Sequence, residues 1–228
     1  MNRILEVCLV AVALATNLTP AAPAQSPALQ KGISVQMPPT SNAVPMPEAD
    51  NEDAWIATVT ADSSMYFGTD PVTPAGLADE MKSRPRNREQ KLYVKADAHT
   101  AFANVERVLE AGRSVFFDAT VLLTAQAESP APGTIVSPKG LDVLVGSSAG
   151  SDSIVVQVSN DGRQGATLKV NNRQIASADL HAILMQLLPT RSEKVVVVKA
   201  DGRLPFADVV HVIDVCHSTG AKVVLANQ

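Results

Sequence analysis

Lys95-Ala96-Asp97 and Lys199-Ala200-Asp201 decide the fold, because the same three residues recur at an offset of 104 residues (201 − 97). The similarity continues downstream at that offset: Phe102-Ala103 with Phe206-Ala207, Val105 with Val209, and Val108 with Val212. Self-similarity at a fixed spacing indicates an internal repeat. We therefore expect the chain to contain one structural unit twice.

The second copy shows the order of elements most clearly. Two β-branched runs flank the turn signal Asn160-Asp161-Gly162 and predict a hairpin. Helical spacing of leucines predicts a helix with Ser177 as its N-cap and Pro189 at its end. Pro205 in the first turn and Gly220 at the end delimit a second helix. The expected strands are 153–159, 167–171, 195–198 and 222–226, and the expected helices are 180–188 and 206–216.

The first copy repeats this order. Its expected strands are 55–60, 65–68, 92–95 and 120–124, with one helix opened by Thr73-Pro74 and another around 102–109. Each unit is therefore predicted to be α+β, with two helices on one face of a small sheet. The units are expected at residues 31–126 and 139–228, and the Pro-rich stretches 38–53 and 127–138 are expected to be linkers or extended edges.

Residues 1–25 form an N-terminal anchor or signal segment. The run 4–18 is largely apolar but contains Glu6. As a signal peptide it would be cleaved after Ala22-Pro23-Ala24, which leaves Gln25 first. As an anchor it is short, because a spanning helix needs about 20 apolar residues and Pro20 interrupts the run. In both interpretations the rest of the chain is exported. The sequence does not decide between a cleaved signal peptide and a retained anchor.

Composition and spacing argue against several functions. The chain carries 19 Lys+Arg and 23 Asp+Glu with a net charge of −4, so no basic stripe is available for nucleic acid. Cys8 and Cys216 form neither a disulfide framework nor a ligand cluster, and both are expected to be buried and unpaired. His211 and His217 are six residues apart on one helix, which separates them around it, so no metal site is predicted. No cofactor is indicated either.

A hydrolase motif is present but lies in the wrong context. Gly146-Ser147-Ser148-Ala149-Gly150 satisfies the Gly-x-Ser-x-Gly pattern, with Asp201 and His211 downstream in hydrolase order. A nucleophile elbow needs a helix directly after the serine, whereas the residues that follow predict a strand. The motif therefore predicts a polar turn, and no catalytic residue is proposed.

Three stretches carry a resemblance to a known family. The segment that opens the first unit is Lys31-Gly32-Ile33-Ser34-Val35-Gln36-Met37-Pro38. In the second unit, an apolar strand ends in Val197-Val198-Lys199-Ala200-Asp201, and the last strand lies in Gly220-Ala221-Lys222-Val223-Val224-Leu225. Their order resembles the periplasmic domain of the ExbD/TolR family of biopolymer transport proteins. The resemblance occurs twice over about 190 residues and implies two tandem ExbD/TolR-like units behind the N-terminal apolar segment.

The resemblance also implies a function. Family members are non-enzymatic components of envelope complexes driven by the proton-motive force, and they work with a multi-helix inner-membrane subunit of the ExbB/TolQ type. They are single-pass proteins of the bacterial inner membrane with their bulk in the periplasm. Leu5-Glu6-Val7-Cys8-Leu9-Val10 resembles the family's transmembrane carboxylate region, so Glu6 is the implied proton-coupling residue. The alternative is a secreted periplasmic protein-binding module, cleaved near Ala24, without proton coupling.

Asp97 and Asp201 end equivalent strands just before helices. We expect their carboxylates to cap those helices, and strand ends also line surfaces that partners use, so both are possible partner contacts. The segments 33–37 and 141–145 are expected edge strands that could pair with another chain. The two copies could instead pair with each other as an internal pseudo-dimer.

Overall fold

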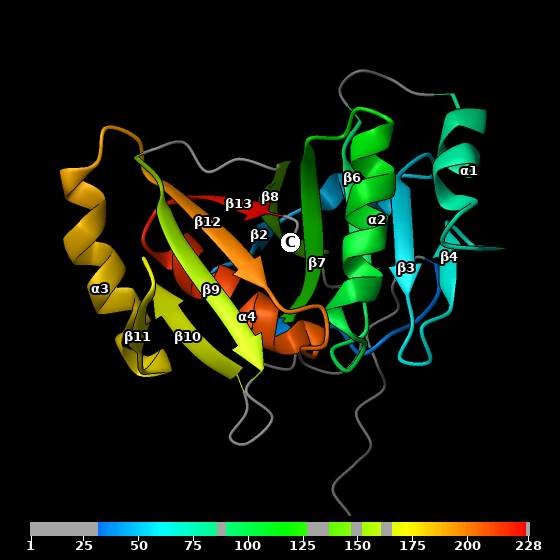
Figure 1. The fold of residues 1–228 in the computed structure, drawn as a ribbon. Helices are drawn as coiled ribbons and strands as arrows, with labels where there is room; N and C mark the ends of the chain where they lie inside the picture. Colours follow the sequence, from blue (N-terminus) through cyan, green and yellow to red (C-terminus); the bar gives the residue numbers. More distant parts are fainter. Residues whose placement is uncertain (1–31, 86–89, 127–136, 147–151, 161–165, 227–228) are drawn as a thin grey trace, which may run out of the picture.

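The computed structural model describes residues 32–85, 90–126, 137–146, 152–160 and 166–226 (Figure 1). Glu6, Cys8, the turn residues Asp161 and Gly162, and Ser147 of the hydrolase-like motif lie outside these residues. Within the described ranges, no helix has the length and hydropathy that crossing a membrane requires.

One order of elements occurs twice: three strands, a helix, a strand, a helix and a strand. In the first half these are β3 (Trp55–Val59), β4 (Met65–Phe67), β5 (Asp70–Val72), α1 (Leu77–Ser83), β6 (Leu92–Ala96), α2 (Phe102–Ser114) and β7 (Ala119–Gln126). In the second half they are β9 (Ile154–Asn160), β10 (Ala166–Val170), β11 (Arg173–Ile175), α3 (Leu180–Leu187), β12 (Val195–Ala200), α4 (Phe206–Ser218) and β13 (Lys222–Ala226).

The remaining elements lie outside this repeated order. β1 (Pro39–Thr40), β2 (Val44–Pro45) and the 3-10 helix η1 (Pro47–Asp50) precede the first half, and β8 (Lys139–Gly146) joins the halves. Two further 3-10 turns, η2 (Ser177–Asp179) and η3 (Leu188–Thr190), flank α3. The stretch 38–53, expected to be a linker or extended edge, therefore contains short pieces of regular structure.

The strands of both halves belong to one sheet, which corrects the expectation of two separate small sheets. Over the described residues it has 13 strands in the order β11-β10-β9-β12-β13-β8-β7-β6-β3-β4-β5, with β1 on β7 and β2 on β8. β8 is the joining strand, antiparallel to β7 with Leu122 opposite Leu141, and parallel to β13 with Leu144 opposite Val224. Figure 1 shows β7, β8 and β13 at the centre of the molecule.

The prediction that residues 33–37 and 141–145 form edge strands is wrong for both segments. Residues 141–145 lie inside β8, which pairs with β7, β13 and β2, and Leu141, Val143 and Val145 are buried. The segment 33–37 has no strand structure, and strand pairing on this side begins only at Pro39. The actual ends of the sheet are the three-residue strands β5 and β11, which are too short to give a clear sequence pattern.

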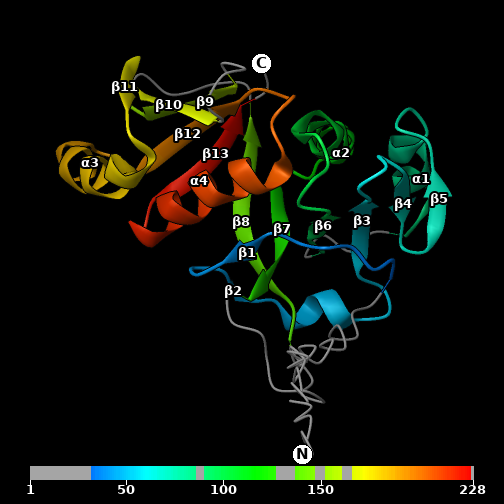
Figure 2. The same cartoon turned by 90° about the horizontal axis from the view of Figure 1, so that it is seen from below.

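Two apolar clusters lie on opposite faces of the strands of the first half. In β6, Leu92 and Val94 belong to the large core that residues of all four α-helices share, whereas Tyr93 belongs to a smaller cluster. The alternation follows from the two-residue repeat of a strand. The smaller cluster also contains Met37 and Met46, so the segment before β3 covers this second face. Figure 2 shows that segment crossing below β7 and β8.

Candidate functional site

The two turns that follow β6 and β12 bind each other through reciprocal backbone hydrogen bonds. We call residues 97–101 and 201–205 the paired turns. The amides of Phe102 and Ala103 donate to the carbonyls of Leu204 and Gly202, at 2.8 and 2.9 Å. At the offset of 104, the amides of Phe206 and Ala207 donate to Thr100 and Ala98, at 2.9 and 3.0 Å. The contact therefore uses the same groups on both sides, as in a twofold interface.

Ala101 and Pro205 form an antiparallel bridge at the centre of this contact. The turns also approach closely at Gly202, where an added Cβ would lie 2.9 Å from the Cβ of Ala103 and 3.2 Å from Glu106 Oε2. Glycine is therefore the residue that lets the second turn lie against α2. Its counterpart in the first turn is Ala98, so the pairing is reciprocal in its hydrogen bonds but not in its side chains.

Asp97 forms hydrogen bonds both within its own turn and to the segment that precedes the first half. Its carboxylate accepts hydrogen bonds from the amides of Gln36 and His99, both at 3.0 Å, and lies 3.1 Å from His99 Nδ1. Burial raises the pKa of Asp97, but the hydrogen bonds from His99 and Gln36 outweigh it and lower the pKa overall. Only 7% of the residue is exposed.

Asp201 is the equivalent residue of the second half and has a different partner. It accepts hydrogen bonds from the amide of Arg203 at 2.9 Å and from both Nε and Nη2 of the Arg203 guanidinium at 3.0 and 2.6 Å. This contact with Arg203 lowers the pKa of Asp201 to about 2. Neither α2 nor α4 has a side-chain N-cap, so the expected capping role is wrong. The carboxylates bind turn amides two residues on instead, and partner contact by either residue stays a prediction.

A segment that we call the strap, residues 36–50, binds both halves. At its start, the Ala98 amide donates to the Gln36 carbonyl at 2.8 Å. At its centre, the Asp214 carboxylate of α4 accepts hydrogen bonds from the amides of Ser41 and Asn42, at 3.0 and 2.8 Å. Asp214 is only 8% exposed. The strap then pairs with β8 through β2, so it crosses from the first half to the second and then to the joining strand.

The strap buries Lys95, the basic residue of the first repeat motif. Lys95 is 1% exposed, and burial lowers its pKa while the carboxylate of Asp50 opposes this effect. The small, partly open pocket beside it has a volume of about 20 Å³, about the space that one water molecule needs. Lys199, at the equivalent position, is only half-buried because the strap covers the first half.

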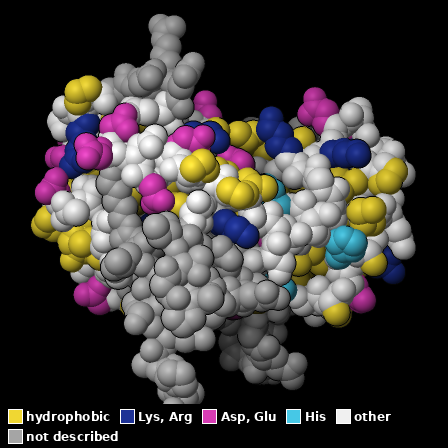
Figure 3. Space-filling view, turned by 180° about the vertical axis from the view of Figure 1, so that it is seen from behind, with side chains coloured by type: hydrophobic (Ala, Val, Ile, Leu, Met, Phe, Trp, Pro, Cys, Tyr) yellow, Lys and Arg dark blue, Asp and Glu magenta, His cyan; other side chains and the backbone are white. Residues whose placement is uncertain are grey.

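The other candidate residues lie apart from the paired turns. His217 Nε2 lies 2.8 Å from the Asp142 carbonyl of β8, whereas His211 is exposed. Cys216 is buried, and burial raises the pKa of its thiol to about 12. In the part of the chain that the structure describes, no three His, Cys, Asp or Glu side chains gather in a metal-binding group. Basic and acidic side chains are interspersed on the face in Figure 3.

Sequence reasoning identified Asp97 and Asp201 but missed the contacts that join the halves. Asp214 was not singled out, because the two strap amides that it binds come from residues more than 170 positions away. The repeat itself contained one usable signal, because Gly202 replaces Ala98 within otherwise similar motifs. Such a replacement indicates a close backbone approach.

These features define an α+β protein in which one order of strands and helices occurs twice around a reciprocal contact. The family model for biopolymer transport protein ExbD/TolR matches residues 6–127 and 136–228. The chain belongs to the ExbD/TolR family, whose members are non-enzymatic accessory proteins of biopolymer transport and energy transduction. No curated protein and no solved structure matches the chain.

Proposed function

We propose that this protein is an accessory component of a biopolymer transport or envelope energy-transduction complex driven by the proton-motive force. The observation that carries the proposal is the family match, which covers both halves and begins at residue 6. The protein would be anchored once in the inner membrane by its N-terminal segment, with its bulk in the periplasm. Its partner would be a multi-helix proton-channel subunit of the ExbB/TolQ type.

The two matched segments would be two ExbD/TolR-like units that form an internal pseudo-dimer, at residues 31–126 and 139–228. Three observations support this: the family match falls in two segments, α2 and α4 have equivalent bounds, and the paired turns exchange hydrogen bonds at one offset. One chain would then contain the two units that a symmetric dimer assembles from two chains, and the units would always be present in a one-to-one ratio.

Glu6 is the residue that would couple the protein to protons. A carboxylate inside an apolar segment is costly to keep ionised, and loss of solvation raises its pKa. Such a group can alternate between charged and neutral forms near neutral pH. The strap would connect that segment to the folded body, because it follows the N-terminal region and contacts both Asp97 and Asp214.

The test is membrane fractionation of the expressed protein, with intact mass and N-terminal sequencing, followed by Glu6→Gln and Glu6→Asp variants. We expect a membrane protein that begins at Met1. Glu6→Gln should lose complex function with normal folding of the described residues, and Glu6→Asp should retain it because it keeps a carboxyl group. Normal envelope function in Glu6→Gln would contradict proton coupling.

The alternative is a secreted periplasmic protein-binding module without proton coupling. It is favoured by the small-residue site Ala22-Pro23-Ala24, where a signal peptidase could cut. A soluble product that begins at Gln25 would establish this alternative and remove Glu6 from the mature protein.

A further inference from the structure

Phe116 combines two unfavourable features at the C-terminal end of α2. Its side chain is 83% exposed, the largest exposed fraction among the large apolar residues that the structure describes. Its φ is +71°, in the left-handed region where residues other than glycine are strained. At the equivalent position after α4 the chain has Gly220, also with φ +71°. A strained backbone with an exposed aromatic side chain suggests a functional requirement at this position.

A hollow of about 310 Å³ lies beside Phe116. Trp55, Met81 and Val115 contribute buried apolar residues to its lining. The volume is at the lower end of the range for ligand sites, so it fits one or two side chains and not a large cofactor. Because α2 has 13 residues, this site lies about 20 Å from the paired turns. It is therefore separate from the contact between the halves.

The charged residues in the lining are Lys82 and Arg84, and no carboxylate is among the lining residues. Lys82 lies 3.2 Å from Asp79, with both side chains largely exposed. An exposed pair of this kind contributes little free energy, so the Lys82 ammonium can turn to a carboxylate on a ligand. The hollow thus joins an apolar floor to one basic side chain that can exchange its partner, Lys82, because Arg84 is bound by Asp70 and Glu80.

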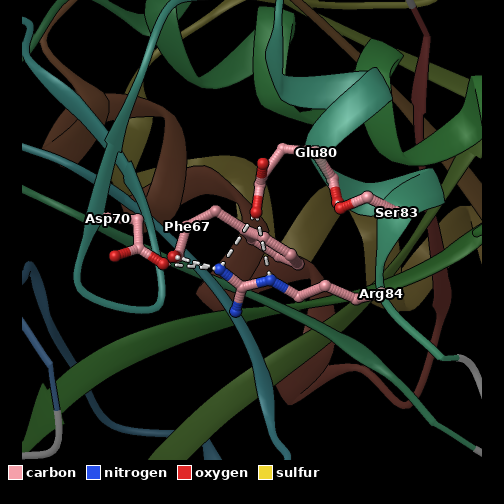
Figure 4. Close-up of polar contacts among 5 residues, drawn as sticks. All are labelled: Phe67, Asp70, Glu80, Ser83 and Arg84. Atoms are coloured by element: carbon pink, nitrogen blue, oxygen red, sulfur yellow. Dashed lines mark hydrogen bonds and ion pairs between the residues drawn. The ribbon is translucent and has the colours of Figure 1, made fainter.

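Arg84 is held in place and forms a fixed wall. Its Nη2 donates to Asp70 at 2.9 Å, to Glu80 at 3.2 Å and to the Phe67 carbonyl at 3.2 Å. Its guanidinium lies over the Phe67 ring, 4.4 Å from the centroid, and Figure 4 shows these groups converging on it. Phe67 in turn packs edge-on against Trp55. A wall that is ordered before binding reduces the entropy cost of binding.

We propose that Phe116 and this hollow form a docking surface for an extended segment of a partner protein that carries a large apolar side chain beside a carboxylate. The apolar side chain lies on the exposed edges of Trp55 and Val115, with Phe116 against its flank. The adjacent carboxylate binds Lys82. A protein segment fits better than a membrane surface, because a hollow recognises a single inserted side chain whereas a membrane would require a broader apolar face.

Trp55 is the one tryptophan of the chain and lines the hollow, so its fluorescence reports binding directly. The probe is an acetylated peptide amide of the order glycine, glutamate, leucine, phenylalanine, glutamate, glycine. Its control contains lysine in place of both glutamates. With the full chain, we expect a saturable fluorescence change for the acidic peptide and a clearly weaker affinity for the basic one.

Variants separate the site from general effects. Phe116→Gly should fold normally, since glycine is the residue at the equivalent position, and should weaken binding at least about tenfold. Lys82→Glu should reverse the preference between the two peptides. Met185→Ala removes another exposed apolar side chain, 50% exposed on α3, and should leave binding unchanged.

Four outcomes would overturn the proposal. One is the absence of a saturable change, another is equal affinity for both peptides, and the third is unchanged binding in Phe116→Gly. A Trp55 response to phosphatidylglycerol-containing vesicles but to neither peptide would likewise overturn it in favour of a membrane contact.

Discussion

Phe116 and Gly220 lie 104 residues apart at the ends of α2 and α4, and both have φ of +71°. The helix end therefore requires the same left-handed residue in both halves. Glycine meets the requirement without steric cost, whereas phenylalanine meets it with strain. The repeat thus provides its own reference residue, because one half shows what the backbone prefers and the other shows a departure from it.

Phe116→Gly should make the protein more stable. Removing left-handed strain from a non-glycine residue is worth about 1 kcal/mol, and the exposed ring contributes little burial to offset the gain. Urea unfolding should show a higher midpoint with an unchanged slope. Gly220→Ala is the matched control, since no atom lies within 4 Å of its added Cβ. Its loss of about 1 kcal/mol would be conformational alone. Equal stability of wild type and Phe116→Gly would show that the ring contributes compensating contacts.

Cysteines at positions 101 and 205 should form a disulfide within one chain. The hydrogen bonds of the bridge run between the residues that flank Ala101 and Pro205, so these two residues form the closely spaced type of antiparallel pair. Their Cβ atoms then lie near the range that a disulfide needs. In a Cys8→Ala background, non-reducing electrophoresis should show a compact monomer after mild oxidation. Cys216 should not compete, because it is buried and its thiol pKa is about 12.

Crosslinked dimers without the intrachain product would contradict the pairing of these turns. Cysteines at His99 and Arg203 serve as a control, because both positions are exposed but are not a bridge pair. They should oxidise more slowly.

The order of elements could be predicted because it depends on local patterns that recur. Pro205 and Gly220 delimit α4 within a residue or two, although Pro205 takes the N-cap position. Ser177 begins a 3-10 turn instead of capping α3. The position of β8 between β7 and β13 could not be predicted, because a strand with alternating apolar residues has the same sequence pattern at the edge of a sheet and inside it.

The site was less predictable than the fold. Asp97 and Asp201 are conspicuous in the sequence because they end the repeated motif, but their partners are not. The Gln36 amide that binds Asp97 comes from a segment 61 residues away that lacks secondary structure. The identity of a residue does not show whether its backbone amide donates a hydrogen bond to a distant side chain. Hydrogen bonds of this kind can be read only from the assembled structure.

Gly140→Ala should destabilise the centre of the sheet. An added Cβ would lie 2.4 Å from Val121 Cγ1 and 3.0 Å from the Leu122 carbonyl, so β8 would have to move away from β7. Overpacking of this kind costs about 1–3 kcal/mol, which denaturant unfolding would measure. Gly146→Ala, on the same strand, is the control, because its nearest neighbour is Val224 Cγ1 at an ordinary 3.6 Å. Equal effects of the two substitutions would contradict the placement of β8 against β7.

The stability of the protein should fall in acid partly through Asp201. Contact with Arg203 lowers the folded-state pKa of Asp201 to about 2, below its value of about 3.9 in an unfolded chain. The stabilisation is therefore present above about pH 4 and is lost as the pH falls through 2. In Asp201→Asn, unfolding measured between pH 7 and pH 2 should depend less on pH. Arg203→Gln should show the same reduced dependence, and the double variant should add nothing further. Wild-type pH dependence in Asp201→Asn would refute this coupling.

Asp214→Ala should loosen the strap more than it affects the rest of the protein. The carboxylate accepts hydrogen bonds from the amides of Ser41 and Asn42, and losing bonds to a charged acceptor costs about 1–2 kcal/mol when water can reach the freed amides. Hydrogen exchange should accelerate in a peptide that covers residues 38–44, with β12 unchanged. Asp214→Asn keeps one acceptor oxygen and should give an intermediate rate. Asp208→Ala, on the same helix, should leave the strap protected. If Asp214→Ala accelerated exchange equally in β12 and in the strap, the strap would be part of the global folding unit. In that case it could not respond independently to movement of the N-terminal segment.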